Sequence, residues 1–150
     1  LLIALVMFGW GASLFFRLSK PPQDAMEFYV VGKQWMWKVQ HPEGVREINA
    51  LHVPVGRPVK LTMTSQDVIH AWWVPDFGMK RDAIPGFVNE LWIRVTPGKE
   101  GVYRGQCAEL CGRDHGFMPI VVDVRSKADF DAWLKQQQAL QRPADPAQTG

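Results

Sequence analysis

The chain opens with an uncharged, mostly apolar stretch, residues 1–16, followed by the charges of Arg17 and Lys20. A membrane span needs about 20 apolar residues, and this stretch covers roughly 24 Å of helix, slightly less than the hydrocarbon core. A signal peptide is the alternative, but a basic leading region and a clear small-residue cleavage site are missing. We therefore expect residues 1–20 to be part of a truncated transmembrane helix that anchors the protein in membrane lipid.

From residue 26 onward the pattern changes to short runs of aromatic and β-branched residues separated by turn residues, which is typical of β-strands. The first run, 26–40, contains Gly32, which we expect to mark a bulge or bend. The other predicted strands are 47–53, 59–64, 68–74, 87–95, 102–106 and 118–124. Several short strands with regular turns predict an all-β domain over residues 21–125, an antiparallel sandwich or barrel.

Helical spacing returns near the C-terminal end of the chain. Ser126 and Asp129 have the spacing of a capping box, with Asp in the Glu position, and apolar residues then recur at helical spacing as far as Leu134. We expect a short helix over residues 126–140 whose apolar face lies on the sandwich. The polar, proline-containing residues 141–150 predict a disordered tail.

Composition and charge exclude one class of partner. The chain has 17 basic and 15 acidic side chains, so it lacks the strong positive charge of nucleic-acid-binding proteins, and we expect no nucleic acid partner. It has seven tryptophans, residues that often lie at interfaces. The sequence contains no Cys-x-x-Cys-His string, and therefore no c-type haem module.

The most informative stretch is 107–118, CAELCGRDHGFM, which contains two Cys, one His, one Met and one Glu within twelve residues. Thiolate and thioether are soft ligands and imidazole is borderline, a combination that suits copper. A blue-copper centre uses one Cys, so the second Cys favours two copper ions that share both thiolates and carry electrons. A structural disulfide between Cys107 and Cys111 is the alternative.

Two coppers need two histidines, and the chain has four. His115 follows Cys111 by four residues and belongs to the same stretch. His41, in a Pro-Gly turn, and His52, in a predicted strand without a nearby ligand type, are expected to be solvated or packed. His70 lies in an apolar aromatic segment, where a hydrogen-bonded core histidine is the alternative to a ligand.

At this point the sequence resembles subunit II of the haem–copper cytochrome c oxidases. The resemblance covers roughly residues 22–133. The shared strings lie at 34–37 (QWMW), 67–75, 82–86 (DAIPG) and 105–119. It implies a cupredoxin-like Greek-key β-barrel or sandwich, anchored in a bacterial or mitochondrial inner membrane, with the copper domain on the periplasmic or intermembrane side. It also implies a mixed-valence dicopper centre.

The resemblance implies a set of metal ligands as well, namely His70, Cys107, Glu109, Cys111, His115 and Met118. In this assignment both Cys bridge the two coppers and each His binds one. Met118 is a weak ligand to one copper and the backbone carbonyl of Glu109 to the other. The Glu109 side chain, a hard ligand, reaches a magnesium or manganese ion at the border with subunit I. A solvated loop residue is the alternative for Glu109.

The implied function is electron transfer within a cytochrome c oxidase. Cytochrome c delivers an electron through the exposed Trp35, and the dicopper centre passes it to a haem in subunit I. There, oxygen is reduced to water and protons are pumped; other oxidase subunits are further partners. On a strand Trp35 and Trp37 would share a face, so one of them could be a core residue.

The family's donor-binding face is usually acidic. The candidates for that face in this sequence are Glu43, Glu47, Asp67 and Asp76. Lys33 and Lys38 flank Trp35 and depart from the pattern, which leaves a membrane-bound or differently charged cytochrome as an alternative donor. Rival functions are a nitrous oxide reductase-like domain, a free-standing cupredoxin, a quinol oxidase subunit and a secreted binding module. The first rival carries an aromatic residue between its two Cys, whereas this chain has Glu109.

Overall fold

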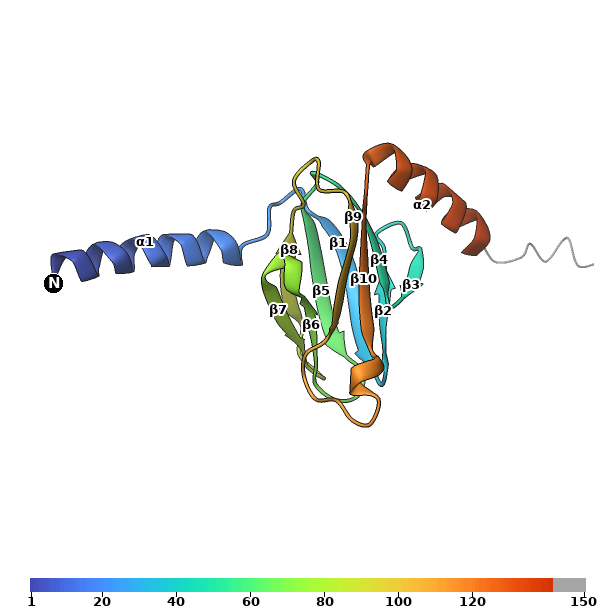
Figure 1. The fold of residues 1–150 in the computed structure, drawn as a ribbon, viewed down its shortest axis with the longest axis horizontal. Helices are drawn as coiled ribbons and strands as arrows, with labels where there is room; N and C mark the ends of the chain where they lie inside the picture. The colour runs from blue at the N-terminus through green and yellow to red at the C-terminus, as the bar shows by residue number, and fades with distance from the viewer. Residues whose placement is uncertain (142–150) are drawn as a thin grey trace, which may run out of the picture.

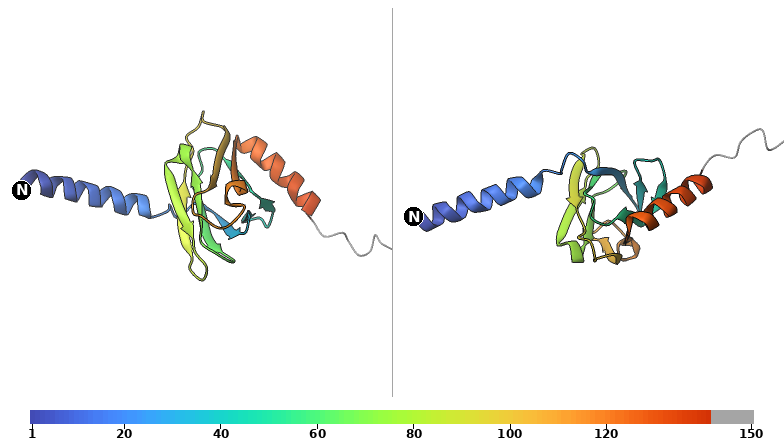
Figure 2. Two further views of the ribbon diagram at one scale, coloured as in Figure 1. Left: turned by 60° about the horizontal axis from the view of Figure 1, so that its bottom comes forward. Right: turned by 90° about the horizontal axis from the view of Figure 1, so that it is seen from above.

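The computed structural model describes residues 1–141, in which a two-sheet β-sandwich lies between two helices (Figures 1 and 2). The helices are α1 (Leu2–Ser19) and α2 (Lys127–Gln141), with the short 3-10 helices η1 (Pro75–Phe77) and η2 (His115–Phe117). The strands are β1 (Met26–Lys33), β2 (Met36–Gln40), β3 (Arg46–Ile48), β4 (Ala50–Pro54), β5 (Val59–Ser65), β6 (His70–Val74), β7 (Met79–Ala83), β8 (Asn89–Ile93), β9 (Gly101–Cys107) and β10 (Pro119–Arg125).

Helix α1 extends away from the sandwich with none of its side chains buried (Figure 1). Its 18 residues have a mean hydropathy of 1.7, so the helix is long and apolar enough to cross a membrane. The helix ends at Ser19, just before the two prolines that follow Lys20. The Trp92 indole on β8 donates a 2.7 Å hydrogen bond to the Leu18 carbonyl, which ties the end of the helix to the sandwich.

The two sheets each have five strands, in the orders β3-β2-β1-β5-β8 and β4-β10-β9-β6-β7. Within them β1 pairs with β5, and β4 with β10, in parallel. The prediction of a wholly antiparallel sandwich is therefore wrong in these two places. The parallel pairs arise because the chain crosses to the second sheet as β4 before it returns to the first as β5.

The predicted first strand, 26–40, is in fact a hairpin that turns at Gln34 and Trp35. Gly32 marks no bulge; it lies inside β1 and pairs with Trp37. A Cβ added at Gly32 would lie 2.8 Å from Cδ2 of His70, so this glycine allows the imidazole to pack directly on β1.

The predicted strand 47–53 is likewise divided, because Asn49 adopts a left-handed conformation with φ of 58°. Its side-chain oxygen accepts a 2.8 Å hydrogen bond from the Trp37 N–H, which replaces a ladder bond at the break. Strand β7 was not predicted, since its sequence MKRDA is polar and mostly exposed. As the last strand of its sheet it has one side unpaired, where polar residues are tolerated.

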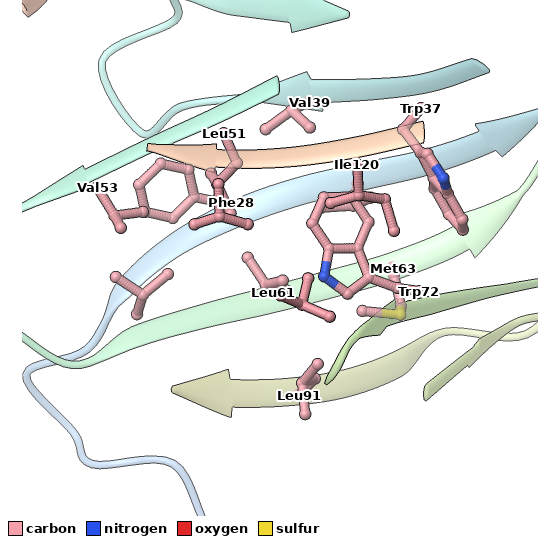
Figure 3. Close-up of a cluster of buried hydrophobic side chains, with 14 of the residues drawn as sticks. Phe28, Trp37, Val39, Leu51, Val53, Leu61, Met63, Trp72, Leu91 and Ile120 are labelled. Atoms are coloured by element: carbon pink, nitrogen blue, oxygen red, sulfur yellow. The ribbon is translucent and has the colours of Figure 1, made fainter. Parts of the chain in front are cut away.

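The core lies between the sheets, where alternate side chains of strands such as β1, β5 and β10 are buried (Figure 3). Its largest fully buried members are Trp37, Trp72, Phe28, Leu51, Leu61, Met63, Met118 and Ile120. Burying a large apolar side chain contributes roughly 1.5–3 kcal/mol, so this layer supplies the main driving force for folding.

Helix α2 lies beside β4 and β10 (Figure 2) and buries Phe130 and Trp133, as its apolar spacing predicts. Ser126 Oγ accepts a 3.2 Å bond from the Asp129 N–H and donates a 2.7 Å bond to the Asp129 carboxylate. The helix continues one residue past the predicted end: Gln141 belongs to it and exchanges two 2.8 Å hydrogen bonds with the Arg46 backbone. The rest of the predicted disordered tail, 142–150, lies outside the described residues.

Candidate metal centre

Three buried side chains converge at one end of the sandwich: His70, Cys107 and Cys111, whose candidate ligand atoms all lie within 4.8 Å of one another. His70 begins β6 and Cys107 ends β9, two strands that are paired through Trp72 and Cys107. Cys111 comes from the loop that follows β9. Strand pairing thus brings His70 next to the Cys loop, although the two are far apart in the sequence.

Each thiol faces one imidazole. The Cys107 Sγ lies 3.8 Å from Nδ1 of His70, and the Cys111 Sγ lies 3.5 Å from Nδ1 of His115. The two sulfur atoms are 3.8 Å apart and both cysteines are free. A disulfide requires about 2.05 Å between its sulfur atoms, so the geometry disfavours the disulfide alternative. The result is a pair of thiols with an imidazole on either side.

The remaining predicted ligands surround this pair. The Glu109 carbonyl accepts a 3.3 Å hydrogen bond from the Cys107 thiol, while the Glu109 side chain is exposed. Met118 is fully buried, and its carbonyl accepts a 3.0 Å bond from the Cys107 N–H. The carbonyls of Glu109 and Met118 thus both lie next to Cys107.

Asp67 sets the orientation of His70. Its carboxylate lies 2.8 Å from Nε2 of the imidazole, which leaves Nδ1 turned toward Cys107. In metal sites, a carboxylate often accepts a hydrogen bond from the second ring nitrogen of a ligand histidine and so fixes the orientation of the ring. Burial alone would raise the pKa of Asp67, but hydrogen bonds from the Gln34 N–H and from His70 lower it to about 2.

Asp67 was predicted as part of an acidic docking face, and its role beside His70 was missed. The available signal was its position three residues before a candidate ligand. Glu47, predicted for the same face, has only 8% of its side chain exposed. It lies 2.6 Å from His41 Nε2 and 2.5 Å from His52 Nδ1. Both histidines are therefore packed, and both contact the Glu47 carboxylate, which the sequence analysis did not predict.

Without a cation, burial keeps the thiol pair protonated. Burial, together with the neighbouring Cys107, raises the pKa of Cys111 to about 12. Two thiolates this close require a strong positive charge to be formed, and soft metal ions supply it. Sulfur and imidazole donors in this number suit copper and are unsuited to magnesium or calcium.

The Trp35 side chain contacts the candidate centre at the backbone of Cys111. It lies in the β1–β2 turn, and its indole N–H donates a 3.3 Å hydrogen bond to the Cys111 carbonyl. The Gln34 side-chain amide donates to the same carbonyl at 2.8 Å. Gly112 lets the ring approach, since a Cβ there would be 3.2 Å from Trp35 Cζ2. Trp37, in contrast, is fully buried and is the core residue of the two.

Comparison with known proteins places the chain in a family. Residues 44–125 match the family described as "Cytochrome C oxidase subunit II, periplasmic domain". A relative from Rickettsia bellii, named probable cytochrome c oxidase subunit 2, is 40% identical over 77% of this chain and 51% of its own length. Cytochrome c oxidase subunit 2 of Cereibacter sphaeroides is 49% identical over 58% of this chain and 28% of its own length. The chain thus spans about half the length of the first relative and less than a third of the second.

A solved structure agrees with the sequence comparison. The periplasmic domain of subunit II of cytochrome oxidase from Bradyrhizobium japonicum is 34% identical, with a TM-score of 0.75 over 81% of this chain and 99% of that domain. The predicted fold class, a cupredoxin-like β-sandwich with an N-terminal apolar helix and a short C-terminal helix, is confirmed. The chain belongs to the cytochrome c oxidase subunit II family.

Proposed function

We propose that this chain is the electron-accepting subunit of a haem–copper terminal oxidase and holds a dinuclear copper centre. The observation that carries the proposal is the pair of buried thiols, 3.8 Å apart, with one imidazole nitrogen beside each. In the proposed centre both Cys107 and Cys111 bridge, and His70 and His115 each bind one copper. Met118 and the Glu109 carbonyl complete the ligand set.

The protein's part in the chemistry is to hold these donors still. Two coppers held by Cys107, Cys111, His70 and His115 would share one electron, so that each metal–ligand bond would change little on reduction. Asp67 fixes the His70 ring, and the Cys107 N–H and Ala108 N–H are anchored on the carbonyls of Met118 and Ala71 at 3.0 Å each. Anchored donors keep the reorganisation on electron transfer small.

The electron would enter on one side of the loop and leave on another. Trp35 is proposed to receive it from cytochrome c or a membrane-bound cytochrome, since its indole is hydrogen-bonded to the Cys111 carbonyl. Leu110 and Phe117 expose 78% and 81% of their surface beside the centre. We assign this apolar surface to contact with subunit I, where the exposed Glu109 carboxylate would bind magnesium or manganese. Reduction of oxygen and proton pumping belong to subunit I.

Helix α1 is proposed to anchor the domain, with the sandwich on the periplasmic side of a bacterial inner membrane or the equivalent side of the mitochondrial one. Its apolar length and the membership of a family of periplasmic domains support this orientation. The proposed domain limits are 1–20 for the anchor and 21–125 for the copper domain, which is followed by the terminal helix that ends at Gln141.

Copper stoichiometry tests the proposal. Loaded with copper and freed of excess metal, the chain is expected to retain two coppers and to show the electron paramagnetic resonance spectrum of one electron shared by both. Cys111→Ser should lose this spectrum, whereas Ala108→Ser, a hydroxyl added to the same loop, should keep it. One copper per chain would instead indicate a blue-copper protein, and a Cys111→Ser variant that keeps both coppers would refute the bridging assignment.

A further inference from the structure

We propose that Gln34, in the β1–β2 turn, is a positioning residue of the candidate metal centre. The proposal rests on the proposed function and concerns how the loop that carries Cys111 is held. Cys107 ends β9, where its pairing with Trp72 fixes the backbone, but Cys111 lies beyond the strand and outside any helix. A ligand on such a loop keeps its position only through contacts from elsewhere in the fold.

Hydrogen bonds attach this loop to the rest of the fold at a single atom. Among residues 1–141, every hydrogen bond that joins residues 109–114 to a residue outside 107–118 ends at the Cys111 carbonyl. The Gln34 side-chain amide donates one of them at 2.8 Å, and the Trp35 indole N–H donates the other at 3.3 Å. An N–H···O bond is most often about 2.9–3.0 Å long, so Gln34 makes the better-formed bond of the two.

Gly112 makes room for the Gln34 amide. Its φ of 120° lies in the region that favours glycine. A Cβ at this position would lie only 3.0 Å from the side-chain nitrogen of Gln34. The residue that follows Cys111 thus has both the backbone conformation and the free space that this hydrogen bond needs.

The backbone of Gln34 is held from the other half of the centre. Its N–H donates a 2.8 Å hydrogen bond to one carboxylate oxygen of Asp67, whose other oxygen lies 2.8 Å from Nε2 of His70. Gln34 therefore connects the carboxylate that orients His70 with the loop that carries Cys111. Its backbone and its side chain together set the position of one half of the centre relative to the other.

Loss of the side-chain bond is expected to loosen the loop while the strands stay paired. Cys111 has only 3% of its surface exposed, so an alkylating reagent reaches its thiol when the loop opens locally. Removing one hydrogen bond of ordinary strength shifts such an opening equilibrium roughly 2- to 10-fold. The alkylation rate of Cys111 therefore measures how firmly the loop is anchored.

The metal-free chain tests the proposal by two readouts. Cys111 precedes Gly112 whereas Cys107 precedes Ala108, so cysteine labelled with ¹³C at its carbonyl, combined with ¹⁵N glycine, selects the Cys111 carbonyl in NMR spectra. Gln34→Met, which has no donor, should move this signal upfield and raise the alkylation rate of Cys111 roughly 2- to 10-fold, measured by mass spectrometry. Gln34→Glu keeps the shape but offers only acceptors when ionised, and should do the same.

Gln106→Met is the matched control. Gln106 directly precedes Cys107, is exposed, and has no side-chain hydrogen bond within residues 1–141. Its substitution should leave the carbonyl signal and the alkylation rate unchanged. In copper-loaded samples Gln34→Met should alter the electron paramagnetic resonance spectrum, whereas Gln106→Met should keep the spectrum of the parent chain.

Circular dichroism identifies the folded variants, and one folded Gln34 variant is sufficient for the test. An unchanged carbonyl signal, alkylation rate or copper spectrum in that variant would overturn the proposal, as would equal effects in Gln106→Met. Failure of the proposed function would appear differently. The parent chain would then retain fewer than two coppers, while the two metal-free readouts would still respond to Gln34.

Discussion

Two residues that bind no metal determine where the His70 imidazole lies. Asp67 holds its outer nitrogen at 2.8 Å, and Gly32 gives the ring room on β1. Neither residue is a ligand type for copper, so a search for ligand strings passes over both. Because Gly32 has no methyl group, the His70 ring can lie directly on β1.

Substitution of Gly32 tests this dependence. In Gly32→Ala the new methyl would lie 2.8 Å from His70 Cδ2 and 3.2 Å from Trp37 Cζ3, both within a packed core. Overpacking of this kind costs about 1–3 kcal/mol, so we expect lower stability in urea unfolding together with weaker copper binding. Gly116→Ala is the control, since a Cβ there has no heavy atom within 4 Å. Equal stability of the two variants would show that the ring can shift freely.

Met118 and Met63 form a matched pair for testing the thioether. Both are buried, with 0% and 1% exposure, so Met→Leu should cost less than about 1.5 kcal/mol at either position. If Met118 is a ligand, Met118→Leu should alter the spectrum and reduction potential of the copper-loaded chain, and Met63→Leu should not. Identical spectra for both variants would show that Met118 is a core residue and not a ligand.

At the scale of elements, a buried ionic cluster joins three strands to α2. Glu47 on β3 lies between His41 and His52, and the second nitrogen of His52 is 3.2 Å from Asp123 on β10. Trp133 of α2 stacks on the His52 ring at 4.1 Å between centroids. The terminal helix therefore rests on side chains that the Glu47 carboxylate holds in place.

This cluster predicts a loss of stability in acid. Burial alone would raise the pKa of Glu47, but hydrogen bonds from His41 and His52 lower it to about 2. Because the folded-state pKa lies below that of the unfolded chain, the ionised carboxylate stabilises the fold above about pH 5, and this is lost as the pH falls toward 2. Linkage gives a contribution on the order of 3 kcal/mol.

Glu47→Gln should therefore be less stable at neutral pH and lose less stability between pH 5 and 2, as measured by urea unfolding across this range. Glu43→Gln, an exposed carboxylate in the neighbouring turn, is the control and should behave like the parent chain. A parallel pH dependence of Glu47→Gln and the parent chain would show that the cluster makes no such contribution.

The sequence predicted some elements better than others for physical reasons. The donors within 107–118 are close in sequence, so their proximity needs no knowledge of the fold, and the Ser126 cap follows from local spacing. The hairpin at Gln34 and Trp35 was missed because neither residue type marks a turn. The parallel strand pairs and β7 depend on contacts between distant parts of the chain, and the placement of His70 came from the family resemblance rather than from spacing.

At the scale of the whole molecule, two half-buried tryptophans of the sandwich contact backbone carbonyls of other elements. Trp35 bonds to the Cys111 carbonyl and Trp92 to the Leu18 carbonyl, each through its indole N–H. The two residues thus make the same kind of contact, one with the candidate centre and one with the helix. Substituting each of them in turn distinguishes a role of Trp35 in electron transfer from a general effect of removing a half-buried tryptophan.

Trp35→Phe removes the hydrogen bond to the Cys111 carbonyl and reduces the aromatic surface. We expect reduction of the copper-loaded chain by its cytochrome donor to slow about tenfold or more, roughly 1.4 kcal/mol in activation free energy, with copper content unchanged. Trp92→Phe should leave the rate unchanged in the same stopped-flow experiment. Equal rates for Trp35→Phe and the parent chain would remove Trp35 from the electron path.

The pairing of β6 with β9 also determines when the two thiols meet their imidazoles. His70 is held near Cys107 through the Trp72–Cys107 register, and β9 is followed by β10, which pairs in parallel with β4. The thiol pair and its imidazoles can therefore assemble only once β6 and β9 have paired and the loop that follows β9 has closed on them. Before that, Cys111 lacks the burial that raises its pKa in the folded chain, so more of its thiolate, the form that peroxide oxidises, is present.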